Sequence, residues 1–453
     1  MTLDRRRIST LRARESARFI EDHPKSQALL ARGRRSMPSG VPMAWMASFL
    51  DHPPMFVAEG KGAYFTDVDG RRYLDMNIAD SSMACGYAPP SVVRAVCEGI
   101  KRGGQFLLPG EDAVAVAEAL AERFGLPRWQ FTLAASSAAT ESFRLARAAT
   151  GRRMIVMFDG KYHGHIDDSL VQLADGAVRP EGLGLLADPA ARTRIVQFND
   201  LNAVEAALKP GDVACVIAEP AHTNYTMLMP EPGFHQGLRA LTREHGALLI
   251  LDEAHTHICA FGGLTRAWGL QPDVLIIGKS LSGGVPLGAY GMSEALAELL
   301  EPDIQVDYGR LDLESRRIAT GGTLFANALS MAAARATLEE ILTEETQLRA
   351  AALGARLSDG IESHARAAGL NWAAHRLYCR SGYFFGPRLP RNAIEARAGD
   401  DAELVALMRV FMANRGVWEA IAKQNPIASF AMTEEDIDLY LEVFGELTAA
   451  LTG

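Results

Sequence analysis

Short apolar runs alternate with amphipathic stretches through the middle of the chain. Each run is a few residues long and continuously apolar, which is typical of a strand that is buried on both faces. The clearest runs cover residues 153–160, 213–220, 247–254 and 273–280. Residues 232–246, which lie between two of these runs, have the spacing of an amphipathic helix. This alternation predicts an α/β fold with a mostly parallel sheet flanked by helices.

The two ends of the chain have a different pattern, which predicts a smaller α+β domain. Residues 61–76 have the alternation of a β-hairpin, with an Asp-Gly pair as its turn. The C-terminal part begins with an alanine-rich helical pattern and ends with a second helical pattern. We expect residues 1–75 and 331–453 to build this smaller domain together, and residues 76–330 to form a large domain.

The composition is that of a globular protein, and it argues against several classes of partner. The net charge is −9 and no Lys/Arg run suggests a basic groove, so we expect no nucleic-acid partner. The five cysteines are scattered without a CxxC spacing, which indicates a reducing compartment. The N-terminal segment lacks an apolar core and no apolar run approaches the roughly 20 residues of a membrane span. We therefore expect a cytoplasmic protein without a membrane partner.

Two short motifs suggest an ATP-driven motor, and their context excludes it. The letters DEAH are residues 252–255, at the end of the apolar run of residues 247–254. The letters IIGKS are residues 276–280, at the end of the run of residues 273–280. A phosphate-binding loop of the form GxxxxGK[ST] would need glycine at position 273, where the chain has Asp273. The lysine also follows the acidic strand end, whereas a motor has the reverse order. The histidines 163, 165, 255 and 257 match no zinc spacing either, so we expect no metal site.

Chemically useful side chains follow each apolar run. The runs are followed by the segment 159–163 (Asp-Gly-Lys-Tyr-His), then by Glu219, Asp252 and Lys279. In an open parallel sheet, ligands bind beyond the carboxyl ends of the strands, so these side chains should converge on one edge. A lysine and an acid at one edge are what pyridoxal phosphate requires, the lysine for a Schiff base and the acid for the pyridinium nitrogen.

The spacing of these motifs resembles that of a known family. LLILDEAHT lies 27 positions before IGKSLSGGVPLGA, counted from Asp252 to Lys279, and resembles the signature of class III pyridoxal-phosphate aminotransferases. The segments KGAYFTDVDGRRYLD, VIAEPAHTN and GGTLFANALSMAAA are similar to further segments of that family. Within the class the chain looks most like glutamate-1-semialdehyde aminomutase and the aminotransferases for D-phenylglycine and β-amino acids. The resemblance implies pyridoxal-phosphate fold type I, with 76–330 as the cofactor-binding domain.

The resemblance implies a role for each of these residues. Lys279 would form the Schiff base and move the proton, and Asp252 would pair with the pyridinium nitrogen. Tyr162 would stack on one face of the ring and Ala254 would lie on the other. Glu219 matches the family's Glu-Pro, near the substrate side, although a structural role is nearly as plausible.

The phosphate loop departs from the family pattern. Where the family reads Ser-Gly-Thr-Glu-Ala, this chain reads Ala-Ala-Ser-Ser-Ala, so Ala135 replaces the glycine and Ser136 the threonine. Backbone N–H groups at a helix start can still bind phosphate there. Thr323 matches a threonine that reaches the phosphate of the neighbouring subunit, which implies a homodimer with shared active sites.

The substrate side of the site carries the weakest signal. The two positions at which family members hold a carboxylate-binding arginine are Ala260 and Met46 here. The nearby apolar residues are Met43, Trp45, Met46 and Phe49. They either line an apolar pocket or pack in the core of the protein. Arg376 and Arg380 remain candidates for a carboxylate, although a solvated position is the more common fate of an arginine.

The chain is therefore predicted to be a pyridoxal-phosphate-dependent aminotransferase with ping-pong kinetics. Its small-molecule partners would be an amine or a hydrophobic amino acid and a keto acid. One alternative keeps the cofactor but makes the protein an aminomutase or racemase, and another is a non-catalytic binding protein of the same fold. His255 holds a position that is often Gln or Met in the family, and we hypothesise that it contacts the 3′-oxygen of the cofactor, with simple packing as the alternative.

Overall fold

The computed structural model describes residues 3–47, 52–224, 226–301, 318–419 and 425–453. The chain divides into two compact units. One unit contains residues 91–343 and 391–393, and the other contains residues 1–90, 344–390 and 394–453. The domain boundaries expected at residues 75 and 330 stay a prediction. Within the described ranges, none of the helices combines the length and the apolar character that crossing a membrane requires.

The unit of residues 91–343 is built on a seven-stranded sheet with the order β4-β12-β11-β10-β9-β5-β8. β8, β5, β9, β10 and β11 pair in parallel, whereas β12 pairs antiparallel with both β11 and β4. The strands are β4 (Arg128–Thr132), β5 (Met154–Phe158), β8 (Thr193–Val196), β9 (Val213–Ala218), β10 (Leu248–Asp252), β11 (Val274–Ile277) and β12 (Gly288–Met292). The expected α/β architecture with a mostly parallel sheet is confirmed.

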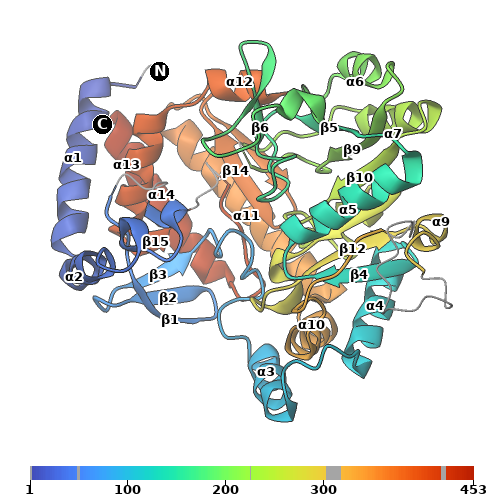
Figure 1. The fold of residues 1–453 in the computed structure, drawn as a ribbon. Coiled ribbons are helices and arrows are strands. Elements are labelled where there is room, and N and C mark those ends of the chain that lie inside the picture. The colour runs from blue at the N-terminus through green and yellow to red at the C-terminus, as the bar shows by residue number, and fades with distance from the viewer. Residues whose placement is uncertain (1–2, 48–51, 225, 302–317, 420–424) are drawn as a thin grey trace. The chain divides into compact units, whose positions relative to one another are not determined.

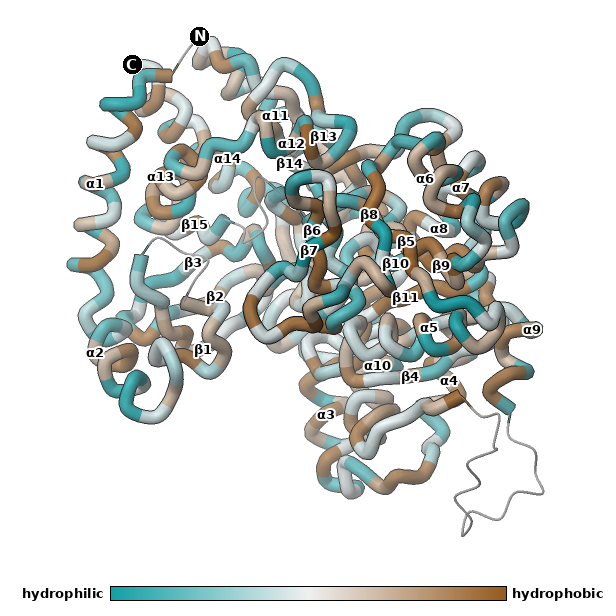
Figure 2. The backbone as a smooth tube through the Cα atoms, turned by 45° about the horizontal axis from the view of Figure 1, so that its top comes forward, coloured by the Kyte–Doolittle hydropathy of each residue, from teal (hydrophilic) through white to brown (hydrophobic). Residues whose placement is uncertain are grey.

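The apolar runs form strands because both faces of the sheet are covered. Every residue of β5, β9 and β11 is buried, and Figure 2 shows the hydrophobic colour along β9 and β11. Helix α5 packs along the sheet against β9, β11 and β12 (Figure 1). The helices of this unit are α3 (Pro90–Arg102), α4 (Glu111–Phe124), α5 (Ala135–Thr150), α6 (Leu201–Leu208), α7 (Phe234–Glu244), α8 (Gly263–Ala267), α9 (Glu294–Ala297) and α10 (Ala328–Glu340). A small hairpin joins β6 (Val171–Ala174) and β7 (Ala177–Pro180).

The other unit is an α+β structure that both ends of the chain build together. Its four-stranded sheet has the order β1-β2-β3-β15, in which β15 from the C-terminal part pairs parallel with β3 from the N-terminal part. The strands of this sheet are β1 (Val57–Lys61), β2 (Tyr64–Asp67), β3 (Arg72–Asp75) and β15 (Val417–Trp418). A separate antiparallel pair is formed by β13 (Ala373–Leu377) and β14 (Arg380–Phe384). The expected hairpin of residues 61–76 is present as β2 and β3.

Helices from the two chain ends complete this unit. They are α1 (Arg5–Glu21), α2 (Pro24–Gly33), α11 (Glu344–Ala367), α12 (Ala393–Ala398), α13 (Ala402–Ala413) and α14 (Glu434–Thr452). Helix α1 packs on α13, and the Arg7 side chain donates a hydrogen bond to the Ala450 carbonyl of α14. Thr433 and Asp436 form a capping box at the start of α14, which holds two N–H groups of that helix end.

Candidate active site

Three of the expected site residues follow neighbouring parallel strands of the seven-stranded sheet. Glu219 comes directly after β9, Asp252 ends β10, and Lys279 lies two residues beyond β11. Because β9, β10 and β11 run in the same direction and neighbouring strands lie about 5 Å apart, their carboxyl ends meet at one edge. Glu219 and Asp252 are buried and Lys279 is half-buried. The structure therefore brings the lysine and both acids to the same edge.

The backbone at Lys279 is strained. Its φ of 52° lies in the left-handed region, which a residue with a Cβ occupies at a cost of roughly 1–3 kcal/mol. The preceding Gly278 packs closely on the start of helix α5, because a Cβ there would lie only 3.1 Å from both the Cβ and the backbone N of Ala135. The lysine is thus placed by a close contact between its strand end and the start of helix α5.

The start of helix α5 can hold an anion. Ala135 is its first residue, and the capping position, Ala134, makes no side-chain hydrogen bond. The first N–H groups of a helix have no partner within the helix, and the positive end of the helix dipole lies there. The Ser136 hydroxyl accepts a hydrogen bond from the His165 backbone N–H at 3.0 Å. Gly164, with a φ of 103°, permits this approach, because a Cβ at that position would lie 2.6 Å from the Ser136 Oγ.

Asp252 is held by two donors. The Nδ1 atom of His163 lies 2.8 Å from Asp252 Oδ2, and the Ala254 backbone N–H donates to Oδ1 at 3.0 Å. His163 is 2% exposed, and its Nε2 atom has no hydrogen-bond partner within the described residues. A carboxylate only accepts hydrogen bonds, so the proton of this pair resides on Nδ1. The segment 159–163 is predicted to reach the site, but no role is predicted for His163 from the sequence, although its position directly after Tyr162 is a signal that could have identified it.

Lys161 and Tyr162 are neighbours in the segment after β5, but their side chains have different surroundings. The Lys161 ammonium is buried and donates to the carbonyls of Ser169 and Val171 and to Glu181 Oε1 at 3.0 Å. Burial lowers the pKa of this ammonium, and Glu181 opposes the shift. Lys161 therefore anchors the loop. Tyr162 is 45% exposed, and its stacking on a ring stays a prediction.

Glu219 belongs to a buried polar cluster with Thr223 and His255. Thr223 Oγ1 lies 2.5 Å from Glu219 Oε2 and 2.5 Å from His255 Nδ1, while Glu219 Oε2 and His255 Nδ1 are 3.8 Å apart. Burial alone would raise the pKa of the Glu219 carboxyl, but the polar contact with His255 and the charges of nearby histidines lower it to about 2. The histidines with this effect are His222, His255 and His163. No role is predicted for Thr223 from the sequence, although it lies in the family-like segment VIAEPAHTN, shortly after the end of β9.

The remaining polar residues of the DEAH segment serve the local structure. The fully buried Glu253 carboxylate accepts hydrogen bonds from the N–H groups of Leu264 and Thr265 at the start of α8. His257 is hydrogen-bonded on both sides, with Nδ1 at 2.9 Å from the Glu253 carbonyl and Nε2 at 3.1 Å from Ser280 Oγ. Burial lowers the pKa of His257 to about 4, so its ring is neutral near pH 7. Ala254 is half-buried beside these groups.

Thr323 lies in an exposed segment of the same unit. Its carbonyl accepts a hydrogen bond from the Gln105 side chain at 2.6 Å. The backbone N–H of Leu329 donates to the Gly104 carbonyl at 3.0 Å, so the segment before α10 lies beside the segment after α3. The predicted contact of Thr323 with a neighbouring subunit stays a prediction.

The apolar residues and the arginines considered for the substrate side belong to the other unit. Met43, Trp45 and Met46 are exposed there, and Phe49 lies outside the described residues. Arg376 is exposed and forms an ion pair with Asp359. The expectation of a solvated side chain is wrong for Arg380, which is 1% exposed and donates to Ser81 Oγ at 2.8 Å. Strand β14 carries it inward, and a charge buried this deeply needs polar partners.

Comparison with known proteins gives consistent similarities. Residues 46–372 match the family Aminotransferase class-III. A glutamate-1-semialdehyde 2,1-aminomutase of Chloroflexus aggregans is 34% identical over 449 residues, which cover 95% of this chain and 99% of that protein. The crystal structure of a glutamate-1-semialdehyde-aminomutase from Pseudomonas aeruginosa PAO1 in complex with PMP has 36% identity and a TM-score of 0.93, with 100% of both chains covered. An omega-transaminase from Sphaerobacter thermophilus has 28% identity and a TM-score of 0.86, covering 94% of this chain and 98% of that one.

Proposed function

The chain belongs to the class-III aminotransferase family, whose members use pyridoxal phosphate, and from this membership we propose that it is an aminotransferase. It would move an amino group between an amine or a hydrophobic amino acid and a keto acid by a ping-pong mechanism. The observation that carries this proposal is the placement of Lys279 and Asp252 at the carboxyl ends of the adjacent parallel strands β11 and β10.

The residues at this edge fit the cofactor. The first turn of α5 supplies N–H groups for a phosphate, with Ala135 and Ser136 as the contacting residues. Gly278 and Gly164 lack a Cβ, which lets the strand end that carries the lysine and the segment that carries the histidine approach that turn closely. When bound, pyridoxal phosphate supplies a ring that withdraws electrons from the substrate carbon bonded to nitrogen. Tyr162 and Ala254 are the residues that we assign to the two faces of that ring.

Three side chains of this edge would carry the chemistry. The Lys279 amine would bind the cofactor and then move the proton at the reacting carbon of the substrate. Asp252 would keep the pyridine nitrogen protonated, because an anionic carboxylate favours a nearby cation. His163 and the Ala254 N–H orient Asp252 for this contact through their hydrogen bonds. Glu219 would act on the substrate side only indirectly, through its contacts with Thr223 and His255.

A second candidate function is an aminomutase of the same cofactor. Relatives named glutamate-1-semialdehyde 2,1-aminomutase that match nearly the whole chain favour it. The sequence favours transfer instead, because the position at which aminomutase-like members hold a carboxylate-binding arginine is Met46 here. An aminomutase returns an isomer of a single substrate, whereas an aminotransferase releases a carbonyl product and needs an acceptor.

We also propose that the protein is a homodimer with shared active sites, located in the cytoplasm. The unit of residues 91–343 exposes a group of large apolar side chains on α3, on the segment from α3 into α4 and on the segment before α10. They are Ile100, Phe106, Leu107, Leu108, Val114 and Leu324. Exposed apolar side chains that cluster in this way are typical of a protein interface. Thr323 adjoins this group, which supports its assignment to the phosphate site of the partner subunit.

A screen of amine donors against pyruvate and 2-oxoglutarate tests the proposed reaction. The protein should carry bound pyridoxal phosphate with a visible absorbance band and should consume an apolar amine or amino acid with an acceptor present. Lys279→Ala should abolish turnover, whereas Lys209→Ala, at an exposed lysine on the same unit, should leave it unchanged. Full turnover by Lys279→Ala would overturn the assignment of the lysine.

A further inference from the structure

We propose that Thr223 is a positioning residue for His255, and that its hydroxyl, anchored on Glu219, fixes the proton of the His255 ring on Nδ1. This inference deepens the proposed function and rests on it only for the meaning of His255 in catalysis. The proton placement itself is a property of the folded chain. Thr223 lies within the family-like segment VIAEPAHTN, but the sequence alone gives it no role.

The side chains of Glu219, Thr223 and His255 form a buried row. Thr223 Oγ1 lies between Glu219 Oε2 and His255 Nδ1, at 2.5 Å from each. The direct separation of Glu219 Oε2 from His255 Nδ1 is 3.8 Å, which is too long for a hydrogen bond. The three side chains are buried, with Thr223 at 0% exposure. The hydroxyl is therefore the link between the acid and the ring.

The protons of this row follow from the ionisation of Glu219. A hydroxyl has a single proton to donate, and a carboxylate can only accept. With its pKa lowered to about 2, Glu219 is an anion near pH 7, so the Thr223 hydroxyl donates to it. The Oγ1 lone pairs then accept from the ring, and the donor must be His255 Nδ1–H. The reverse chain would need a protonated Glu219, which that pKa excludes near neutral pH.

The behaviour of the His255 Nε2 atom follows from the chemistry of imidazole. A neutral ring that carries its proton on Nδ1 is an acceptor at Nε2, and it donates from Nε2 only when it is protonated there as well. A glutamine side chain, by contrast, carries amide donors at every pH. Any hydrogen bond from His255 to the 3′-oxygen of the cofactor therefore depends on the ionisation of the ring. The titratable groups that face Glu219 and His255 are His163, His222 and His257.

The side chains of Thr223 and Glu219 are both held in place. The β-branched side chain of Thr223 has few rotamers, which keeps the hydroxyl between its two partners. The Asn224 side chain donates to the other carboxylate oxygen, Glu219 Oε1, at 3.3 Å, so the acid is held on both oxygens. Valine has the shape of threonine but no hydroxyl, so Thr223→Val removes the link with little change in volume. Thr223→Ser keeps the hydroxyl and is the conservative variant.

Nitrogen-15 NMR of histidine-labelled holoenzyme tests the assignment directly. The His255 signals, identified by their loss in His255→Gln, should show a protonated Nδ1 in the wild type and in Thr223→Ser. Thr223→Val should lose that pattern and shift the pH midpoint at which the absorbance of bound pyridoxal phosphate changes. Thr337→Val, which removes a buried hydroxyl bonded to the Ala333 carbonyl in α10, should leave both readouts unchanged.

The possible failures are distinguishable. A wild-type signal with the proton on Nε2, or a Thr223→Val variant that keeps the wild-type signal and titration, would overturn the inference. If Thr223→Val does not fold, the wild-type signal and the Thr223→Ser spectrum still decide the position of the proton. Failure of the proposed function would appear in the amine-donor screen, and it would leave the NMR result unaffected.

Discussion

His163 Nδ1 lies 2.8 Å from Asp252 Oδ2, although 89 positions separate the two residues in the sequence. The loop after β5 delivers the histidine, and the end of β10 delivers the aspartate. Because both side chains are buried, the hydrogen bond is formed where water does not compete, and it fixes the orientation of the carboxylate. In the proposed function, this pair would determine how Asp252 is presented to the pyridine nitrogen of the bound cofactor.

Removing the histidine should weaken the cofactor site. His163→Ala deletes a hydrogen bond to a charged group, which is worth roughly 1.5–3 kcal/mol. We expect the affinity for pyridoxal phosphate to fall about ten- to a hundredfold, measured by equilibrium dialysis of the apoenzyme. His165→Ala, at an exposed histidine two residues further on, is the matched control and should bind normally. Equal affinities of the two variants would refute the assigned role of His163.

A methyl group at Gly164 should displace the phosphate-binding turn. A Cβ at this position would lie 2.6 Å from both the Cα and the Oγ of Ser136, and the φ of 103° is unfavourable for alanine. We expect Gly164→Ala to lower both the melting temperature and the cofactor affinity, by a strain of roughly 1–3 kcal/mol. Gly176→Ala shares the positive φ but meets no atom within 4 Å, so it separates backbone strain from the clash. The prediction fails if the two variants bind the cofactor equally well.

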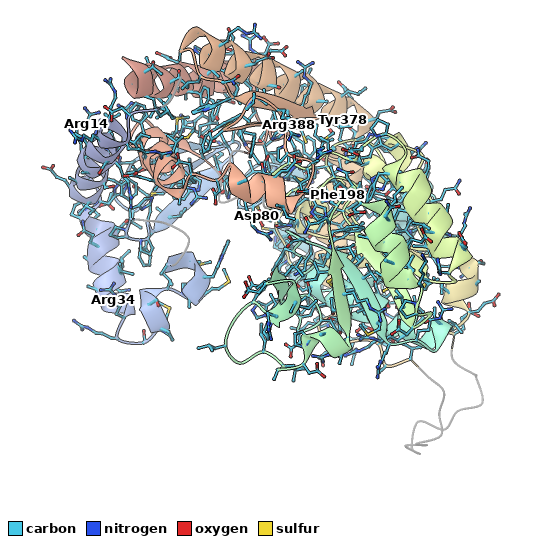
Figure 3. All side chains as sticks on the ribbon, turned by 90° about the horizontal axis from the view of Figure 1, so that it is seen from above. Arg14, Arg34, Asp80, Phe198, Tyr378 and Arg388 are labelled. Carbon is cyan, nitrogen blue, oxygen red and sulfur yellow. The ribbon has the colours of Figure 1, made fainter. Side chains whose placement is uncertain are left out.

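The buried ring of His222 should make the protein sensitive to acid. Burial lowers the pKa of His222 from 6.5 to about 4, and neither ring nitrogen has a hydrogen-bond partner in the described part of the chain. The ring packs on Phe198 with centroids 4.5 Å apart (Phe198 is labelled in Figure 3). Because the unfolded state binds the proton first, the stability is complete above pH 6.5 and falls as the pH decreases towards 4.

His222→Phe should remove this acid sensitivity. The wild type should lose up to roughly 3 kcal/mol of unfolding free energy from this group between pH 6.5 and pH 4. The phenylalanine variant lacks the titrating ring and should show a flatter dependence over that range. Urea unfolding at several pH values measures both slopes. Parallel slopes for the two proteins would show that His222 does not titrate in this manner.

Charge in the exposed apolar group should dissociate the proposed dimer. Leu108 is 74% exposed in this chain, and Leu108→Glu would place two carboxylates in the interface of a symmetric dimer. We expect dimerisation to weaken by roughly 2 kcal/mol or more, with loss of activity because Thr323 would no longer reach the partner. Sedimentation velocity measures the assembly. Leu348→Glu, at an exposed leucine of α11, should remain dimeric; a monomeric wild type would contradict the proposal.

The sequence predicted those features that depend on local pattern. Continuous apolar runs identified β5, β9, β10 and β11, because both faces of these strands are buried. The rule that parallel strands share their carboxyl ends then brought Asp252 and Lys279 together.

The missed features depend on long-range packing. The contact of His163 with Asp252 requires a loop whose glycines at 160 and 164 adopt positive φ, and apolar periodicity does not report such a loop. Thr223 meets His255 from an irregular segment 32 positions away. Arg380 is buried by the packing of β14, although arginine usually stays in water.

Amino-group transfer can be observed in the half-reaction alone. Holoenzyme is mixed with a single amine donor and no acceptor, and the carbonyl product is quantified per active site. An aminotransferase should release one equivalent of aldehyde or ketone. It should also leave the cofactor as pyridoxamine phosphate until a keto acid is added. Conversion of the donor into an isomer, with no carbonyl product and no retained pyridoxamine phosphate, would contradict amino-group transfer.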